Sequence, residues 1–312
     1  MEMFKKTTTI DFLGARHIAV GISALLIVAT IVMVVMRGIN FGIDFTGGVL
    51  VEAKYPEAIE LSTVRDALGN GGIDDSVVQY FGENTDVLVR VQPDENADGA
   101  SVGEAVRAAL RTADAGVKIQ RTEFIGPRVG EELREDGGLA MLFALLLILA
   151  YVTLRFQWKF ALGAVVALVH DVVITIGFFA AFQVPFDLPV LAALLAVIGY
   201  SLNDTIVVFD RIRENFRALR KRTPVEVMNL SLNQTLSRTL MTSGTTLLVV
   251  LALYFLGGSA IDEFALALIV GVVLGTYSSI YVASSAALAL KVTAVDLLPP
   301  KDEEDPELEA IP

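Results

Sequence analysis

Long apolar stretches dominate the hydrophobic pattern of this chain. Six of them stand out, and each approaches the roughly 20 residues that a helix needs to cross a hydrocarbon core of about 30 Å. They cover residues 18–36, 137–154, 160–182, 188–209, 240–256 and 264–290. The pattern therefore predicts an α-helical integral membrane protein with six transmembrane helices.

Residues 41–136, between the first and second apolar stretches, follow a different pattern. Alternating or β-rich runs are separated by segments with helical spacing, and a Gly-Glu-Asn-Thr turn is expected at residues 82–85. The expected strands are residues 48–55, 77–81, 87–91 and 117–124, and the expected helices are residues 61–69 and 101–112. The order βαββαβ is typical of a ferredoxin-like sandwich. We expect a small α+β domain outside the membrane.

The first apolar stretch has two interpretations. Lys5, Lys6 and Arg16 precede it, as basic residues precede the apolar segment of a cleaved signal peptide. No small-x-small cleavage motif follows, however, and the stretch ends Val-Met-Arg-Gly. These features favour an uncleaved transmembrane anchor.

The composition agrees with a membrane protein and narrows the chemistry. Hydrophobic residues make up 54% of the chain and the mean hydropathy is +0.61, whereas soluble chains contain roughly 45–50% apolar residues. The chain has no cysteine, and its two histidines, His17 and His170, lie far apart. Disulfides, thiol chemistry and a His/Cys metal cluster are therefore not expected. We expect no cofactor, no metal, no enzymatic activity and no nucleic-acid partner.

Basic residues lie at alternate ends of the apolar stretches, which predicts an orientation. They precede the first stretch, separate the second from the third, and fill residues 210–239, whereas residues 183–187 and 257–263 contain no Lys or Arg. With six crossings, both termini are expected in the cytoplasm and residues 41–136 in the periplasm. Residues 1–17 would form a cytoplasmic N-terminus, and residues 291–312 an acidic, solvated cytoplasmic tail.

Two aspartates lie inside apolar stretches, where a carboxylate is costly and needs a partner or a cavity. Asp171 follows His170 in the third stretch, and Asp204 lies in the fourth, about 8 Å from its centre at 1.5 Å per residue. Tyr200 and Asp204 share one helix face, and Asn203 lies on the adjacent one. These residues are our candidates for intramembrane chemistry.

Arg238 opens the fifth stretch on the side where the fourth ends, so it is expected within a few turns of Asp204. Burial favours a protonated carboxyl and a nearby guanidinium opposes this, so motion of the arginine or entry of water could load and unload a proton. We interpret Asp204, with Arg238, Asn203, Tyr200 and Asp171, as a proton relay. The alternatives are a packing cluster of Asp204, Asn203 and Tyr200, a bracing role for Asp171, and an interfacial anchor role for Arg238.

Three motifs then point to a family. Phe41, Gly42, Asp44, Gly47 and Gly48 lie in the segment Phe-Gly-Ile-Asp-Phe-Thr-Gly-Gly, where the glycines allow a turn into the first strand and the aspartate can bond backbone amides. Residues 199–215, including Asp210 and Arg211, and residues 237–246 complete the set. In this order, over nearly the whole chain, they resemble the SecF family of the bacterial Sec protein-export machinery.

The resemblance implies a fold related to resistance-nodulation-division transporters and a partner, SecD, with a matching six-helix half. It also implies that proton flow powers late, ATP-independent movement of a polypeptide through the SecYEG channel across the inner membrane, with YajC and YidC as further partners. The membrane carboxylate and arginine of the family correspond to Asp204 and Arg238. Some members fuse SecD and SecF, and because this sequence starts at Met1 with a short polar lead, we expect a separate subunit.

Three other functions compete with this one. An intramembrane aspartyl protease also has aspartates on neighbouring helices, but its motifs resemble Tyr-Asp and Gly-x-Gly-Asp, whereas here the contexts are His170-Asp171 and Asn203-Asp204. A proton-coupled drug or lipid exporter of the same superfamily usually carries two six-helix halves. A translocon scaffold remains an alternative if the buried charges never titrate.

Overall fold

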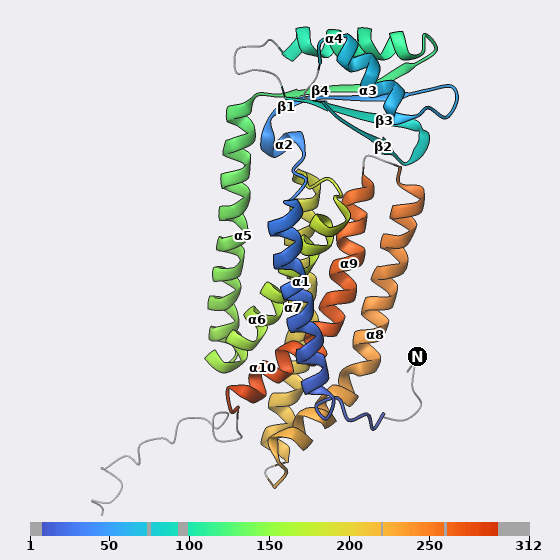
Figure 1. Ribbon diagram of the computed structural model, residues 1–312. Coiled ribbons are helices and arrows are strands. Elements are labelled where there is room, and N and C mark those ends of the chain that lie inside the picture. The colour runs from blue at the N-terminus through green and yellow to red at the C-terminus, as the bar shows by residue number, and fades with distance from the viewer. Residues whose placement is uncertain (1–7, 74–75, 93–98, 220, 259–260, 293–312) are drawn as a thin grey trace, which may run out of the picture.

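A bundle of long helices carries a small sheet domain at one end (Figure 1). The computed structural model describes residues 8–73, 76–92, 99–219, 221–258 and 261–292. The acidic tail expected at residues 291–312 therefore lies outside the described residues from residue 293 onward.

Six helices of the described residues are long and apolar enough to cross a membrane, which confirms the prediction of six transmembrane helices. Five are single α-helices: α1 (Arg16–Arg37), α5 (Pro127–Arg155), α6 (Trp158–Phe182), α7 (Leu188–Ala218) and α8 (Pro224–Leu256). The sixth consists of α9 (Asp262–Ser278), the π-helical turn η2 (Ser279–Ala283) and α10 (Ser284–Ala289).

Three of these helices extend beyond their apolar stretches into polar sequence. Helix α5 begins at Pro127, so residues 127–136, expected in the outer domain, are continuous with the membrane helix. Helices α7 and α8 extend into the basic segment expected as a loop at residues 210–239. At the start of α8, Thr223 and Glu226 form a capping box that satisfies free backbone amides.

The sheet domain has the predicted βαββαβ order. Its elements are β1 (Gly48–Lys54), α3 (Leu61–Asn70), β2 (Ser76–Phe81), β3 (Glu83–Val91), α4 (Gly99–Ala113) and β4 (Lys118–Ile125). The antiparallel sheet has the order β2-β3-β1-β4, and both helices lie over one face (Figure 1). The ferredoxin-like prediction is confirmed, and a core of Val and Leu side chains from strands and helices holds the domain together.

One turn differs from the prediction. The reversal between β2 and β3 occurs at Gly82, with a φ of 82°, and not over residues 82–85. A register irregularity between Tyr80 and Phe81 accompanies it, so Glu83 already pairs as a strand residue. A glycine that tolerates positive φ permits this tighter turn.

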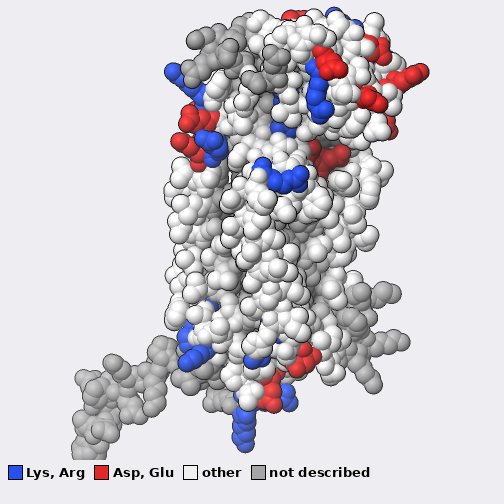
Figure 2. All heavy atoms as spheres, in the orientation of Figure 1, with Lys and Arg blue, Asp and Glu red and all other residues white. Residues whose placement is uncertain are grey.

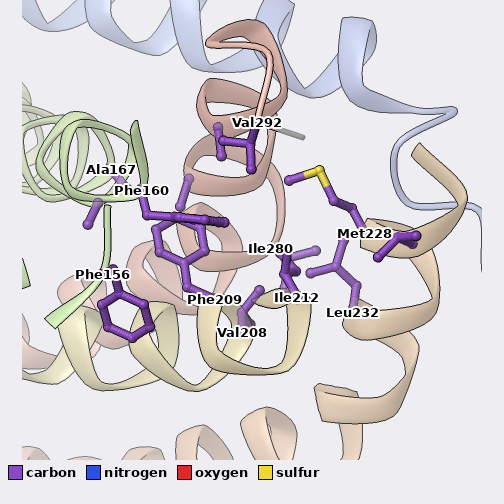
Figure 3. Close-up of a cluster of buried hydrophobic side chains, with 14 of the residues drawn as sticks. Phe156, Phe160, Ala167, Val208, Phe209, Ile212, Met228, Leu232, Ile280 and Val292 are labelled. Atoms are coloured by element: carbon purple, nitrogen blue, oxygen red, sulfur yellow. The ribbon is translucent and has the colours of Figure 1, made fainter. Parts of the chain in front are cut away.

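A second hydrophobic core lies at the opposite end of the bundle (Figure 3). Phe160 of α6 packs on Phe209 of α7 with 4.9 Å between ring centroids. Met228 and Leu232 of α8 join the same cluster, as Figure 3 shows. This core fixes the extensions of α7 and α8 against each other and so sets the rotation of both helices where they enter the membrane region.

Charged side chains gather at the two ends of the molecule. On the face shown in Figure 2, Lys, Arg, Asp and Glu lie over and just beneath the sheet domain and at the far end, and the belt between them is free of charge. Hydrocarbon cannot solvate ions, so such a belt is the surface that a membrane-spanning bundle requires.

Candidate functional site

Asp204 lies on α7, facing α8, and is only 2% exposed. Its carboxylate accepts hydrogen bonds from Thr242, with 3.3 Å between Oγ1 and Oδ1, and from Ser243, with 3.4 Å between Oγ and Oδ2. Thr276 of α9 donates in turn to Ser243 at 2.7 Å. Hydroxyl hydrogen bonds are normally 2.5–3.0 Å long, so this buried carboxylate is held loosely.

Arg238 lies one turn before Thr242 on α8, as the sequence indicates, and its side chain is exposed. No hydrogen bond or ion pair joins it to Asp204 among the described residues, although the guanidinium acts on that carboxylate through space. A long, exposed arginine can therefore change its distance from Asp204 without breaking a bond to it.

Tyr200 and Asn203 do not contact Asp204 through a hydrogen bond. Asn203 is exposed, and the Tyr200 hydroxyl is buried with no hydrogen-bond partner among the described residues. Successive side chains on a helix point about 100° apart, so Asn203 turns outward when Asp204 faces α8. The alternative of a packing cluster made by these three side chains is not formed.

Asp171 occupies a separate and tighter site on α6, and it is 1% exposed. Its Oδ2 accepts short hydrogen bonds from Ser201 of α7, at 2.7 Å, and Ser278 of α9, at 2.6 Å. Its Oδ1 lies 2.9 Å from Nδ1 of His170. The two membrane aspartates therefore differ: Asp171 makes three short polar contacts, whereas Asp204 makes two long ones.

Helix α9 reaches both aspartates through nearby residues. Thr276 donates a hydrogen bond to Ser243, which in turn contacts Asp204, and Ser278 donates a hydrogen bond to Asp171 directly. Sequence reasoning did not select these residues, nor Ser201. The run Thr-Tyr-Ser-Ser at residues 276–279, inside an apolar stretch, was the signal that could have found them.

The glycine-rich motif connects the sheet domain to the helix bundle. Asp44, in the short helix α2 (Ile43–Thr46), accepts a hydrogen bond from the amide of Leu188 at 2.9 Å. The amide of Gly42 donates to the carbonyl of Phe186 at 2.7 Å. Asp44 thus bonds a backbone amide, as its residue type indicates, but at the distant start of α7 and not in its own turn.

Gly47 and Gly48 make close backbone contacts that exclude a side chain. Gly47 has a φ of 71°, and a Cβ there would lie 2.7 Å from Cα of Pro127. Gly48 has a φ of 128°, and its Cβ would lie 2.7 Å from the carbonyl oxygen of Val91. The pair brings β1, β3 and the start of α5 together.

A buried arginine completes this junction. Arg90 of β3 donates to Oδ1 of Asn40 at 3.1 Å and to the carbonyl of Phe41 at 3.0 Å. Burial lowers the pKa of its guanidinium, and the negative charges of Asp187 and Glu263 oppose that effect. All three charged groups line a cavity of about 450 Å³ between the sheet and the bundle.

Asp210 and Arg211, the remaining motif residues, lie farther along α7. Asp210 is 3.6 Å from Arg155, and Arg211 pairs with Glu214 at 2.9 Å. Neither bonds Asp204. Among the described residues no group of His, Asp and Glu is arranged to hold a metal ion.

Comparisons with known proteins match two segments to described families. Residues 105–293 match "Protein export membrane protein SecD/SecF, C-terminal", and residues 32–55 match the "SecD/SecF GG Motif". The second segment contains Gly47 and Gly48 of the junction.

Whole-chain relatives agree with these matches. The protein translocase subunit SecF of Pseudomonas aeruginosa is 53% identical over 95% of this chain and 96% of its own length. SecF of Vibrio alginolyticus is 48% identical over 97% of both chains.

A solved structure with a related fold is SecDF from Thermus thermophilus, described as a translocon-associated membrane protein. It is 39% identical, with a TM-score of 0.84 over 93% of this chain. The present chain spans 40% of the length of that SecDF chain. By whole-chain identity and family match, the chain belongs to the SecF family of protein translocase subunits.

Proposed function

We propose that this chain pairs with SecD and uses the proton motive force to promote late, ATP-independent movement of proteins through the SecYEG channel. Asp204 would take up and release the proton, and Arg238 would tune that exchange. The role is one of transport and includes no catalytic step.

The loose coordination of Asp204 carries this proposal. A buried carboxylate with two long hydrogen bonds gains little stabilisation of its charged form, so uptake of a proton costs little. Asp171, with three short contacts, is held more tightly and is not needed for proton exchange at Asp204.

An exposed polar face beside Asp204 supports a second membrane half. Asn203 of α7, with Arg238 and Thr245 of α8, is exposed although these helices cross the membrane region. Polar groups are costly against lipid and in membrane proteins usually face another helix or a water-filled path. SecD is the natural partner, since the solved relative carries its counterpart of this chain as 40% of a longer SecDF chain.

The proposed location is the bacterial inner membrane, with both termini in the cytoplasm and the sheet domain in the periplasm. Basic residues lie where α7 ends and α8 begins and also between the apolar stretches of α5 and α6, and this distribution supports the orientation. SecYEG is proposed as the channel served, and YajC and YidC as accessory partners. The translocating polypeptide would meet the periplasmic domain.

The substitution Asp204→Asn tests the relay. In membrane vesicles that contain the chain with SecD and SecYEG, proton conductance should fall by about 100-fold or more, the lower range for removal of a positioned proton-transfer group. Proton-driven translocation should be lost, and ATP-driven translocation by the channel should remain.

Asp210→Asn is the matched control because Asp210 lies on the same helix but outside the Asp204 site. It should leave proton conductance within about twofold of the unsubstituted chain. Surface substitutions usually change the free energy of unfolding by only ~0.5 kcal/mol, so the fold and the Asp204 site should be preserved. Normal proton dependence in the Asp204→Asn variant would reject the relay and leave the scaffold function. An exporter half would instead conduct protons without any effect on preprotein movement.

A further inference from the structure

A second chain of polar contacts lies on the α1 side of the bundle. His170 of α6 is buried, and its Nε2 lies 3.0 Å from Oγ of Ser23 in α1. Ser23 Oγ lies 3.1 Å from the hydroxyl of Tyr277 in α9, and that hydroxyl donates to the carbonyl of Ala19 at 2.8 Å. Together with Asp171, these groups tie α1 to α6 and α9.

The number of protons in this series of polar contacts follows from which atoms can only accept. The Ala19 carbonyl can only accept, so the single hydroxyl proton of Tyr277 is used there. The contact between Ser23 and Tyr277 then needs the Ser23 proton. With its own proton directed at Tyr277, the Ser23 oxygen can only accept from Nε2 of His170.

The other ring nitrogen of His170 faces a carboxylate. Asp171 Oδ1 is 2.9 Å from Nδ1, so one proton lies between these two atoms if they are hydrogen-bonded. With a further proton on Nε2, the His170–Asp171 pair must hold two protons if all four contacts are to be hydrogen bonds. The arrangement fits an imidazolium paired with an ionised Asp171.

With only one proton, the His170–Asp171 pair cannot keep all of these contacts. An ionised Asp171 keeps that proton on Nδ1, so Nε2 accepts the Ser23 proton, and Tyr277 can then satisfy either Ser23 or Ala19 but not both. The loss falls on the contacts that hold α1, because Ser23 and Ala19 both belong to that helix. Protonation of His170 thus strengthens the attachment of α1 to the bundle.

The surroundings add few competing charges. The titratable groups that face the His170 ring are Asp171 of α6 and Tyr277 of α9, with the Tyr277 ring stacked at 6.1 Å, while α1 faces it with Ser23. Tyr281 of η2 shares the same groove of about 570 Å³ between α1, α6 and the end of the last membrane helix.

We propose that His170 and Asp171 form a second proton-binding site, distinct from Asp204, whose loading fastens α1 to α6 and α9 through Ser23 and Tyr277. The site goes beyond the proposed Asp204 relay and uses a different carboxylate. The proposal for His170 and Asp171 can therefore fail while the Asp204 relay stands, and the reverse. Because Thr276 and Ser278 reach the two carboxylates from one helix, a change at either site can be transmitted through α9.

Nitrogen-15 NMR of histidine tests the proposal directly. The chain has only two histidines, so a His17→Gln variant leaves His170 as the sole ring to be observed. In the full-length, histidine-labelled chain in lipid bilayers, both ring nitrogens should be protonated in acid, and Nε2 should lose its proton as the pH is raised. A ring whose protonation does not change with pH would overturn the proposal.

The variant Tyr277→Phe gives a sharper test, since it removes the acceptor that holds the Ser23 proton. Ser23 is then free to donate to Nε2, so the titration should move to lower pH by one unit or more, that is, by at least about tenfold in proton affinity. Asp204→Asn should leave the titration in place. An unchanged titration in Tyr277→Phe, or its loss in Asp204→Asn, would contradict a separate site built on Ser23 and Tyr277.

Discussion

The two membrane aspartates show how little the identity of a residue says about its role. Both are almost fully buried, and both face hydroxyl groups of neighbouring helices. The contacts of Asp171 are 2.6–2.9 Å long, whereas those of Asp204 are 3.3–3.4 Å long. Charge-assisted hydrogen bonds weaken steeply with distance, so only Asp171 is well stabilised as an anion.

Removal of single hydroxyls should reveal this difference. Ser278→Ala deletes a 2.6 Å bond to Asp171 and should destabilise the protein by about 1–2 kcal/mol, the upper range for polar contacts within membranes. Ser243→Ala deletes a 3.4 Å bond to Asp204 and a contact with Thr276, whose hydroxyl keeps its 2.7 Å bond to the carbonyl of Val272, so it should cost less than about 0.5 kcal/mol. Thermal unfolding of the purified variants measures both. Equal losses would show that the two carboxylates are held equally well.

The charge of Asp187 should make stability depend on pH. Burial raises the pKa of this carboxyl above its ordinary value of 3.8, and the negative charge of the nearby Asp44 raises it further. The hydrogen bond from the Val190 amide and the positive charge of Arg90 lower the pKa and so oppose that effect. An acid with a raised pKa binds more protons in the folded state, so the free energy of unfolding falls as pH rises from about 4 through the raised value.

Asp187→Asn should remove this part of the pH dependence. Asparagine caps a helix as well as aspartate does, so the bond to Val190 is retained and only the ionisation is lost. Unfolding curves from about pH 4 to pH 8 should decline less steeply for the variant than for the unsubstituted chain. Parallel curves would show that Asp187 ionises without cost.

At the scale of elements, the junction between sheet and bundle is built from backbone proximity. Gly47 and Gly48 let β1 pass against β3 and the start of α5, and Asp44 bonds the start of α7. The sheet domain is therefore fixed to two membrane helices at its base. Its position depends on glycines that no other residue replaces without strain.

Gly47→Ala should weaken this junction. The combination of a φ of 71° with a ψ of 173° is nearly restricted to glycine and costs another residue about 1–3 kcal/mol, and the clash with Pro127 adds to that cost. Gly138→Ala in α5 is the control, because a Cβ there meets nothing within 4 Å and alanine favours helix by roughly 0.5–1 kcal/mol. Unfolding should show a loss for the first and no loss for the second; a neutral Gly47→Ala would mean that the backbone relaxes.

At the scale of the whole molecule, the bundle presents one polar face within the membrane region. Asn203 and Arg238 are exposed there, whereas the exposed positions of α5 from Leu139 to Leu147 are all apolar. A single bundle leaves this polar face uncovered. This uncovered face is consistent with the proposed pairing with SecD.

Spin labels can locate the face that a partner covers. The chain has no cysteine, so Asn203→Cys and Leu147→Cys each provide one labelling site. When SecD is present, collision of membrane-dissolved oxygen with the label at position 203 should fall severalfold, and that at position 147 should stay unchanged. Equal accessibility of position 203 with and without SecD would place the partner elsewhere.

The sequence by itself determined the six membrane helices and the βαββαβ domain. Hydrocarbon requires about 20 consecutive apolar residues per helix, and a half-buried strand alternates apolar and polar residues with period two. Each feature can therefore be recognised within one short segment of the sequence. Helix ends were less evident, because the proline that starts α5, the capping box that starts α8 and the residues that continue α7 to Ala218 lie in polar sequence.

Only the tertiary structure decided which side chains meet. Asp204 was selected from its sequence position, but its partners Thr242 and Ser243 depend on how α8 rotates against α7. The bond from Leu188 to Asp44 and the contact between His170 and Ser23 join residues more than 140 positions apart. Such contacts are set by helix packing and domain docking, which period and residue type along one segment cannot encode.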